Sequence, residues 1–72
     1  MSETEMAILR QFRAYQAKSN EMLFLNSGHA KSHPREFARA VNSLMERKLV
    51  VKERPRDAYS LTPSGYAASL SA

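Results

Sequence analysis

The sequence predicts a mostly α-helical domain with one small β-hairpin, in the order helix, helix, helix, hairpin, helix. Three observations support this. Apolar residues recur with a helical period from His33 to Leu49, they switch to a period of two over 50–61, and Thr62-Pro63 then provides a helix start. Seventy-two residues allow one domain, 1–72, with a single small core.

The first predicted helix covers residues 4–18. Ser2 stands three residues before Glu5, which is the spacing of a capping box. The helix is amphipathic, so one of its faces should pack on the core. The stripe expected on that face is Ile8, Phe12 and Tyr15.

The segment after Ser19-Asn20 allows two readings. Ser19-Asn20 can cap a short second helix whose buried residues are Met22, Leu23 and Phe24, and Asn26-Ser27-Gly28 would end it. A short strand over 22–25 is the alternative, because a four-residue apolar run fits either structure. His29 to Ser32 is expected to be a loop.

The third predicted helix covers residues 34–48, with Pro34 at its first position and His33 or Ser32 as its cap. Its expected buried face is Phe37, Ala40, Val41 and Leu44. Turn residues at Arg54-Pro55-Arg56-Asp57 then divide 50–61 into a hairpin. In the last helix, which Thr62 caps, Tyr66 and Leu70 are expected to pack on the core.

Positive charge is concentrated in the second half of the chain. Residues 1–30 carry three basic and three acidic side chains, whereas residues 31–56 carry eight basic and three acidic ones, a balance of +5. An electropositive end of this kind favours a polyanionic partner.

The predicted third helix and hairpin place candidate nucleic-acid contacts together. Opposite the buried face of the helix lie Arg35, Arg39 and Asn42, at i, i+4 and i+7, with Glu36 and Ser43 beside them. Arginine suits the guanine edge and asparagine the adenine edge. Lys31, Ser32 and His33 approach the N-terminus of the helix, where a phosphate is favoured. The hairpin adds Lys52, Arg54 and Arg56.

A helix followed by a basic hairpin resembles a winged helix-turn-helix, in particular the multiple-antibiotic-resistance regulator (MarR) family and its phenolic-acid regulator (PadR) relatives. The matching landmarks are Leu44, Glu46-Arg47, Leu49-Val50, Asp57, Leu61-Thr62 and Gly65. The resemblance implies binding of double-stranded DNA and transcriptional regulation, with helix 34–48 in the major groove and hairpin 50–61 as the wing. It also implies that the residues named above face bases or phosphates.

The chain departs from that family at three points. The connection over 26–32 is longer than the turn of about 3–4 residues in a tight helix-turn-helix. Lys48 stands where the family usually has glycine, because the chain turns there with positive φ, a conformation that costs lysine about 1 kcal/mol. The long flanking helices through which the family dimerises have no counterpart here, although a homodimer is a further partner to consider for a core of this size.

Other chemistry finds little support. With two glycines the chain has no glycine-rich phosphate-binding loop. Asp57 has no evident Ser–His partner in the sequence, and a domain of this size leaves little room for a substrate pocket, so neither an enzyme nor a cofactor is expected. His29 and His33 are four residues apart, but no further ligand completes a metal site. The alternative function is a winged-helix protein-interaction module, either an adaptor or a phage-encoded inhibitor of a host protein.

The sequence also sets an expectation for location. The acidic start does not resemble a secretory signal, and the longest apolar run, 22–25, is far too short to span a membrane. We therefore expect a small cytoplasmic prokaryotic or phage factor that associates with the nucleoid if it binds DNA, and no membrane partner.

Overall fold

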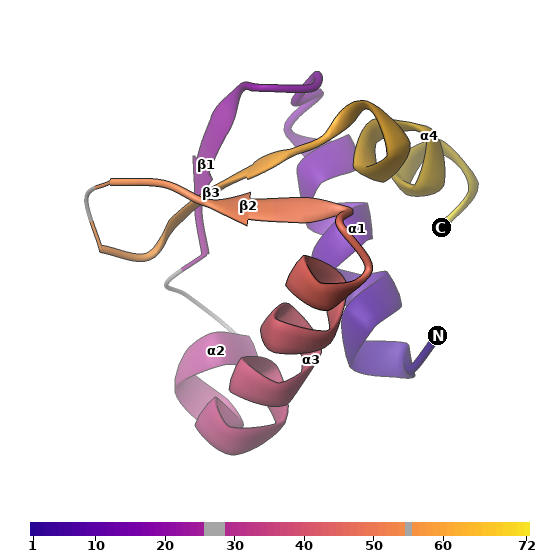
Figure 1. The fold of residues 1–72 in the computed structure, drawn as a ribbon. Helices are drawn as coiled ribbons and strands as arrows, with labels where there is room; N and C mark the ends of the chain where they lie inside the picture. Colours follow the sequence, from indigo (N-terminus) through magenta and orange to yellow (C-terminus); the bar gives the residue numbers. More distant parts are fainter. Residues whose placement is uncertain (26–28, 55) are drawn as a thin grey trace.

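The computed structural model describes residues 1–25, 29–54 and 56–72. Within these residues the chain forms four helices and a three-stranded antiparallel sheet (Figure 1). In chain order the elements are α1 (Glu3–Ala14), β1 (Met22–Phe24), α2 (His29–Ser32), α3 (Pro34–Glu46), β2 (Val50–Lys52), β3 (Ala58–Leu61) and α4 (Pro63–Ser71).

Helix α1 begins with the predicted capping box. The Ser2 hydroxyl accepts from the Glu5 amide at 3.1 Å, and the Glu5 carboxylate accepts from the Ser2 amide at 2.9 Å. The helix ends at Ala14, four residues earlier than predicted. Gln16 takes a φ of 56°, and the amide of Ala17 donates to the Phe12 carbonyl, so the chain leaves the helix through a left-handed turn.

The predicted second helix after Ser19-Asn20 is wrong, and the alternative of a short strand is confirmed as β1. Met22 and Phe24 are about half exposed, whereas Leu23 is partly buried and Leu25 is fully buried. This alternation places every second side chain on the core, as a strand requires. β1 pairs antiparallel with β3, with Leu23 opposite Tyr59.

The expected loop over His29–Ser32 is also wrong, because these residues form the short helix α2. Four residues make only one turn, which is too short to show a helical period in the sequence. α2 leads directly into α3 (Figure 1). The predicted helix end at Asn26-Ser27-Gly28 and the predicted turn proline, Pro55, lie outside the described residues.

Helix α3 begins at Pro34 as predicted and ends at Glu46, two residues before the predicted end. His33 occupies the N-cap position, but its side chain makes no capping hydrogen bond with the described residues. Lys48 has a φ of 60°, and the amide of Leu49 donates to the Leu44 carbonyl. The predicted positive φ at Lys48 is therefore confirmed, and it stops the helix early.

The predicted hairpin is confirmed. β2 pairs antiparallel with β3, with Val51 opposite Ser60, and the sheet order is β1-β3-β2. The inner face of the sheet packs on the helices through Leu25, Val50 and Leu61. The outer face exposes Met22, Phe24 and Val51 on either side of the small β3 residues Ala58 and Ser60.

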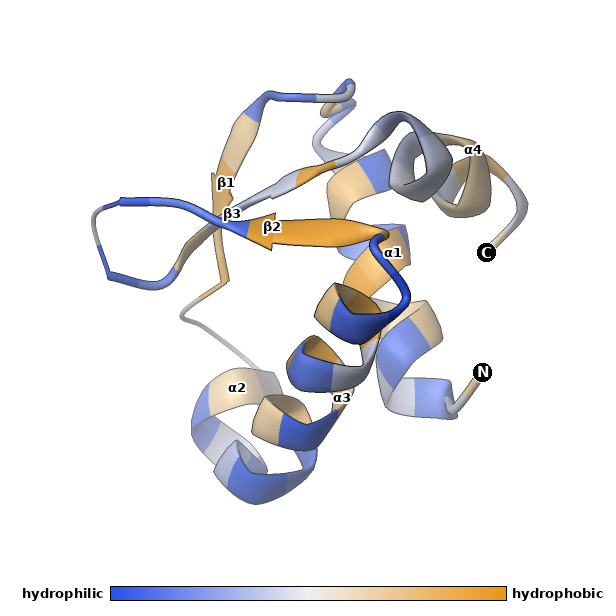
Figure 2. Ribbon diagram, viewed as in Figure 1, coloured by the Kyte–Doolittle hydropathy of each residue, from blue (hydrophilic) through white to orange (hydrophobic). Residues whose placement is uncertain are grey.

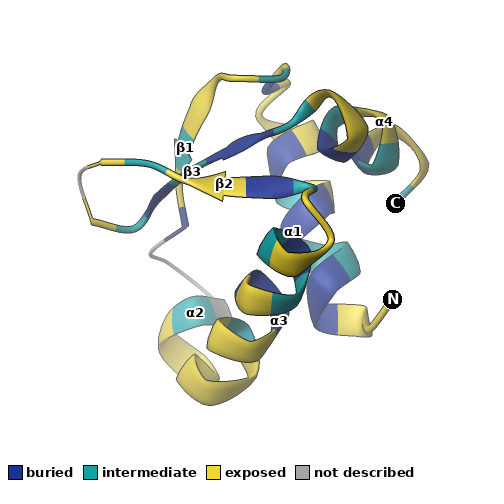
Figure 3. Ribbon diagram, in the orientation of Figure 1, coloured by how far each residue is buried: buried dark blue, intermediate teal, exposed yellow. Residues whose placement is uncertain are grey.

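The core lies between α1, α3, α4 and the inner sheet face. Polar, exposed residues lie on the outward faces of the helices (Figures 2 and 3). Ile8, Phe12, Ala40, Val41 and Leu44 are buried as predicted, while Phe37 and Tyr66 are only partly buried. The predictions for Tyr15 and Leu70 are wrong, since these side chains are 68% and 50% exposed. Tyr15 follows the last residue of α1, so it no longer keeps the helical phase.

Helix α4 starts as predicted and lies very close to the chain between α3 and β2. The Thr62 hydroxyl accepts from the Gly65 amide at 2.9 Å and donates to the Lys48 carbonyl at 2.7 Å. A Cβ atom on Gly65 would lie 1.8 Å from the Leu49 carbonyl oxygen. Glycine is therefore required at this contact. No helix in the described part of the chain has the length and apolar content needed to cross a membrane.

Candidate nucleic-acid interface

Helix α3 turns one face to the core and the other to solvent. Ala40, Val41 and Leu44 are buried, so the opposite side carries the exposed side chains of Arg35, Arg39 and Asn42 at i, i+4 and i+7. The structure therefore brings these three predicted site residues onto one outward face. Glu46 is exposed one helical turn further on, so the face is cationic only in its N-terminal part.

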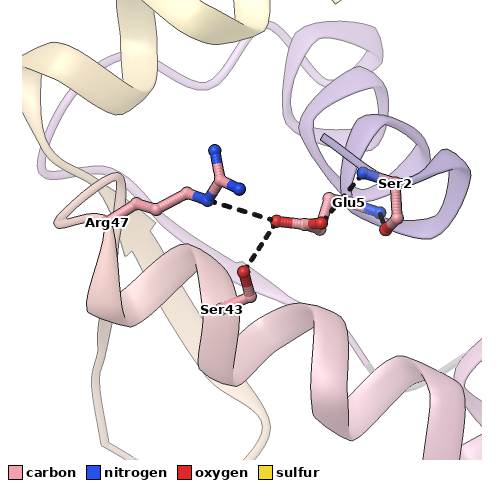
Figure 4. Close-up of polar contacts among 4 residues, drawn as sticks. All are labelled: Ser2, Glu5, Ser43 and Arg47. Atoms are coloured by element: carbon pink, nitrogen blue, oxygen red, sulfur yellow. Dashed lines mark hydrogen bonds and ion pairs between the residues drawn. The ribbon is translucent and has the colours of Figure 1, made fainter.

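Two predicted site residues of α3 lie instead against α1. The Ser43 hydroxyl donates to Glu5 Oε2 at 2.9 Å, and the Glu36 carboxylate accepts from the Thr4 hydroxyl at 3.0 Å. These contacts hold α1 and α3 together, and Figure 4 shows the one between Ser43 and Glu5. Sequence reasoning placed Ser43 beside the outward face because the buried partner, Glu5, sits on a helix far away in sequence.

Glu5 is only 6% exposed, and it contacts Ser2, Ser43 and Arg47. The amide of Ser2 is the main cause that lowers the pKa of the Glu5 carboxyl below its ordinary value, and the Ser43 hydroxyl and the Arg47 guanidinium act in the same direction while burial opposes them. Arg47 Nε lies 3.7 Å from Glu5 Oε2 (Figure 4). The carboxylate therefore fixes the position of α3 relative to α1.

The hairpin carries its basic residues toward its tip, between the end of β2 and the start of β3. Lys52, Arg54 and Arg56 are all exposed. Lys52 Nζ lies 5.0 Å from the centre of the Tyr59 ring, directly across the β2–β3 pair, so the ring holds the ammonium group over the strand. Burial, together with the nearby Asp57 carboxylate, raises the pKa of the Tyr59 hydroxyl, which therefore stays protonated at neutral pH.

A groove of about 530 Å³ separates the helices from the hairpin. Lys31 comes from α2, Asn42 from α3, and Arg56, Asp57 and Tyr59 from the hairpin, so the groove joins three parts of the predicted site. Leu25, Phe37, Val41 and smaller apolar residues line the rest of it. Sequence reasoning missed Tyr59 and Asp57 as site residues, although the pairing of Tyr59 with Lys52 across the predicted hairpin would have indicated Tyr59.

The short helix α2 and its junction with α3 hold the remaining predicted residues. Lys31, Ser32 and His33 are exposed and precede the first turn of α3. They lie near the same end of the molecule as Arg35. The structure thus gathers Lys31, Ser32 and His33 with the outward face of α3, and it separates them from Ser43.

The basic side chains of this surface lack ion-pair partners in the part of the chain that the structure describes. Within residues 1–25, 29–54 and 56–72, ion pairs are absent from Lys31, Arg35, Arg39, Arg54 and Arg56. Across the same residues, no three histidine or acidic side chains gather closely enough to hold a metal ion. The surface therefore carries an excess of positive charge, although Glu36, Glu46 and Asp57 are acidic members of it.

Comparison with known proteins finds no matching family model, no matching curated protein and no matching solved structure.

Proposed function

We propose that this chain is a winged helix-turn-helix domain that binds double-stranded DNA, as a transcriptional regulator or a DNA-architectural factor. Helix α3 would enter the major groove with Arg35, Arg39 and Asn42 toward the base edges, and the β2–β3 hairpin would contact the adjacent backbone. The observation that carries the proposal is the groove lined jointly by Lys31, Asn42 and Arg56, because it places α2, α3 and the hairpin around one cationic surface.

The strand β1 supports this proposal. It hydrogen-bonds to β3, and the amide of Leu25 donates to the Asp57 carbonyl at 2.8 Å. The hairpin is therefore fixed to the domain at its base and again beside its tip. A hairpin held in this way can keep its basic residues at a constant distance from α3, as simultaneous contact with one duplex requires.

The exposed α3 residues are of the types that read bases. Arginine can donate two hydrogen bonds to guanine, and asparagine can pair with adenine in the same way, each discriminating by about 1–3 kcal/mol. Glu36, bound to Thr4, remains exposed and would repel phosphate or accept from cytosine. The outward face thus supports a preference for particular sequences in addition to attraction to phosphate.

The test is fluorescence anisotropy with a random-sequence duplex, titrated between about 50 and 200 mM salt. Each phosphate contact should add about −0.9 to the slope of log affinity against log salt. Replacing Arg39→Ala and Arg54→Ala together should reduce the magnitude of that slope by about 1 to 2. Selection from a random library would then identify the preferred site.

The matched control is Arg10→Ala with Lys18→Ala, which removes the same charge from exposed positions on α1 and the loop after it. We expect this variant to bind almost as the native chain does. A well-folded native chain that fails to bind the duplex even at 50 mM salt would exclude the proposal.

A second candidate, a protein-interaction module, is favoured by the outer face of the sheet. Met22, Phe24 and Val51 are 50%, 46% and 45% exposed there, and apolar patches often mark protein partners. Affinity for such a partner would change little with salt, whereas affinity for DNA would fall steeply. The same salt titration therefore separates the two candidates.

A further inference from the structure

The groove between α3 and the hairpin, on which the proposed function rests, has a lining that indicates which part of DNA it would bind. One wall is formed by α2 and α3 through Lys31 and Asn42, and the other by the hairpin through Arg56 and Tyr59. Apolar side chains, among them Phe37 and Val41, lie between these polar groups. The groove thus has donors on both walls and a nonpolar floor.

In the proposed binding mode, one sugar–phosphate strand of the DNA would pass through this groove. A single sugar–phosphate strand separates the major groove from the adjacent minor groove. If α3 lies in the major groove and the hairpin lies across the neighbouring backbone, that strand runs between them. The deoxyribose is the less polar part of the strand and suits the floor, while the phosphate suits the walls.

We infer that the groove seats one phosphodiester of a DNA strand, held from opposite sides by Lys31 and Arg56. The Tyr59 hydroxyl supplies a further donor from the hairpin wall, while Asn42 stands at the edge of the groove with its amide left for the bases. This inference rests on the proposed function, which it deepens by naming the part of DNA that the groove binds. Charge complementarity supports it, because neither cation has an ion-pair partner among the described residues.

Asp57 is an acidic residue in the lining of the groove, and its replacement provides a further test. Its carboxylate shares the groove with Lys31 and Arg56, so it should repel the phosphate. Asp57 has a φ of 67°, a conformation that asparagine tolerates well. Asp57→Asn should therefore keep the fold and bind DNA several-fold more tightly.

The experiment measures the salt slope of duplex binding for Lys31→Ala, Arg56→Ala and the double variant. If both cations neutralise the same phosphate, either one can serve alone, so each single variant should change the slope by clearly less than 1. The double variant should lower its magnitude by about 1. Circular dichroism and thermal melting would check that each of these exposed substitutions leaves the fold intact.

Matched controls separate the groove from general charge effects. Arg54→Ala removes a hairpin cation that does not line the groove, so combining it with Lys31→Ala should add the two separate losses. Glu3→Gln removes an exposed acid on α1 and should leave affinity almost unchanged, in contrast to Asp57→Asn.

Two results would overturn the inference while leaving the proposed function standing. One is a slope loss of about 2 in the Lys31/Arg56 double variant, which would assign the cations to separate phosphates. The other is no slope change in that variant, together with no gain from Asp57→Asn. Failure of the native chain to bind any duplex would instead reject the proposed function itself.

Discussion

At the scale of single residues, Glu5 is the most heavily connected side chain of the described chain. It closes the capping box of α1, accepts the Ser43 hydroxyl from α3 and lies beside Arg47. A buried carboxylate is stable only when its oxygens are hydrogen-bonded, as they are here. Glu5 therefore stabilises both the N-terminus of α1 and the packing of α1 against α3.

We predict that Glu5→Gln lowers the free energy of unfolding at pH 7 by about 1–2 kcal/mol, because charge-assisted hydrogen bonds become neutral ones. The folded pKa lies below the ordinary value of 4.5. The stabilisation is therefore present at neutral pH and is lost as the pH falls below about 4.5, through the folded pKa.

Urea unfolding at pH 7 and at stepwise lower pH would measure this. The native chain should lose stability more steeply on acidification than Glu5→Gln does. Glu3→Gln, in the same turn but exposed, is the control and should resemble the native chain. Equal acid sensitivity of the Glu5 variant and the native chain would contradict the assigned role.

At the scale of elements, the two longest helices end in the same way. Gln16, two residues after the end of α1, has a φ of 56°, and Lys48, two residues after the end of α3, has a φ of 60°. In each, the next residue donates its amide to a carbonyl five residues earlier, which is the hydrogen-bond pattern of a Schellman motif. Glycine usually occupies this position because a side chain strains the left-handed conformation.

We predict that Gln16→Gly and Lys48→Gly each raise the free energy of unfolding by about 0.5–1 kcal/mol. The relief of strain should exceed the greater freedom that glycine gives the unfolded chain. Thermal melts would measure the gain. Arg47→Gly is the contrasting variant. Because Arg47 has a φ of −78° and pairs with Glu5, this change should lower the free energy of unfolding, through added chain freedom and through loss of the ion pair.

The elements also show where the sequence was sufficient and where it was not. α1, α3, the hairpin and α4 carry strong periods or capping residues, and all four are present near their predicted positions. β1 and α2 are too short for a period to develop, and only the pairing with Tyr59 and its neighbours makes 22–24 a strand. Long-range pairing of this kind cannot be inferred from local pattern.

The candidate site likewise has features that the sequence predicted and features that it did not. The exposure of Arg35, Arg39 and Asn42 follows from the phase of α3, and this was predictable. Two other features depend on how α3 packs against α1 and the sheet. One is the contact of Ser43, in α3, with Glu5 of α1, and the other is the groove that Lys31 and Arg56 line together. These features require the tertiary structure.

At the scale of the whole molecule, Gly65 lets α4 close over the core. Gly65→Ala places a Cβ 1.8 Å from the Leu49 carbonyl oxygen, which is backbone and cannot move away without displacing the start of β2. We predict a loss of at least about 2 kcal/mol, or about 10 °C in melting temperature for a chain of this length.

Thermal melts would test the effect, with Ser64→Ala as the control one residue earlier on an exposed position of α4. The control should melt within about 2–4 °C of the native chain. A Gly65→Ala variant as stable as Ser64→Ala would show that α4 can move away from Leu49 at little cost.

The position of β3 in the sheet has a consequence for how the chain reaches its fold. β3 is the last strand in sequence but the central one in space, so β1 and β2 both find their partner there. Helices can form while a chain is still being synthesised, because their hydrogen bonds are local, whereas β1 must wait for a partner from the far end of the chain. We therefore expect β1 to pair late in folding, after the β2–β3 hairpin, whose contacts are local. That pairing sets the register of β1, and it is needed before Lys31 and Arg56 can line one groove.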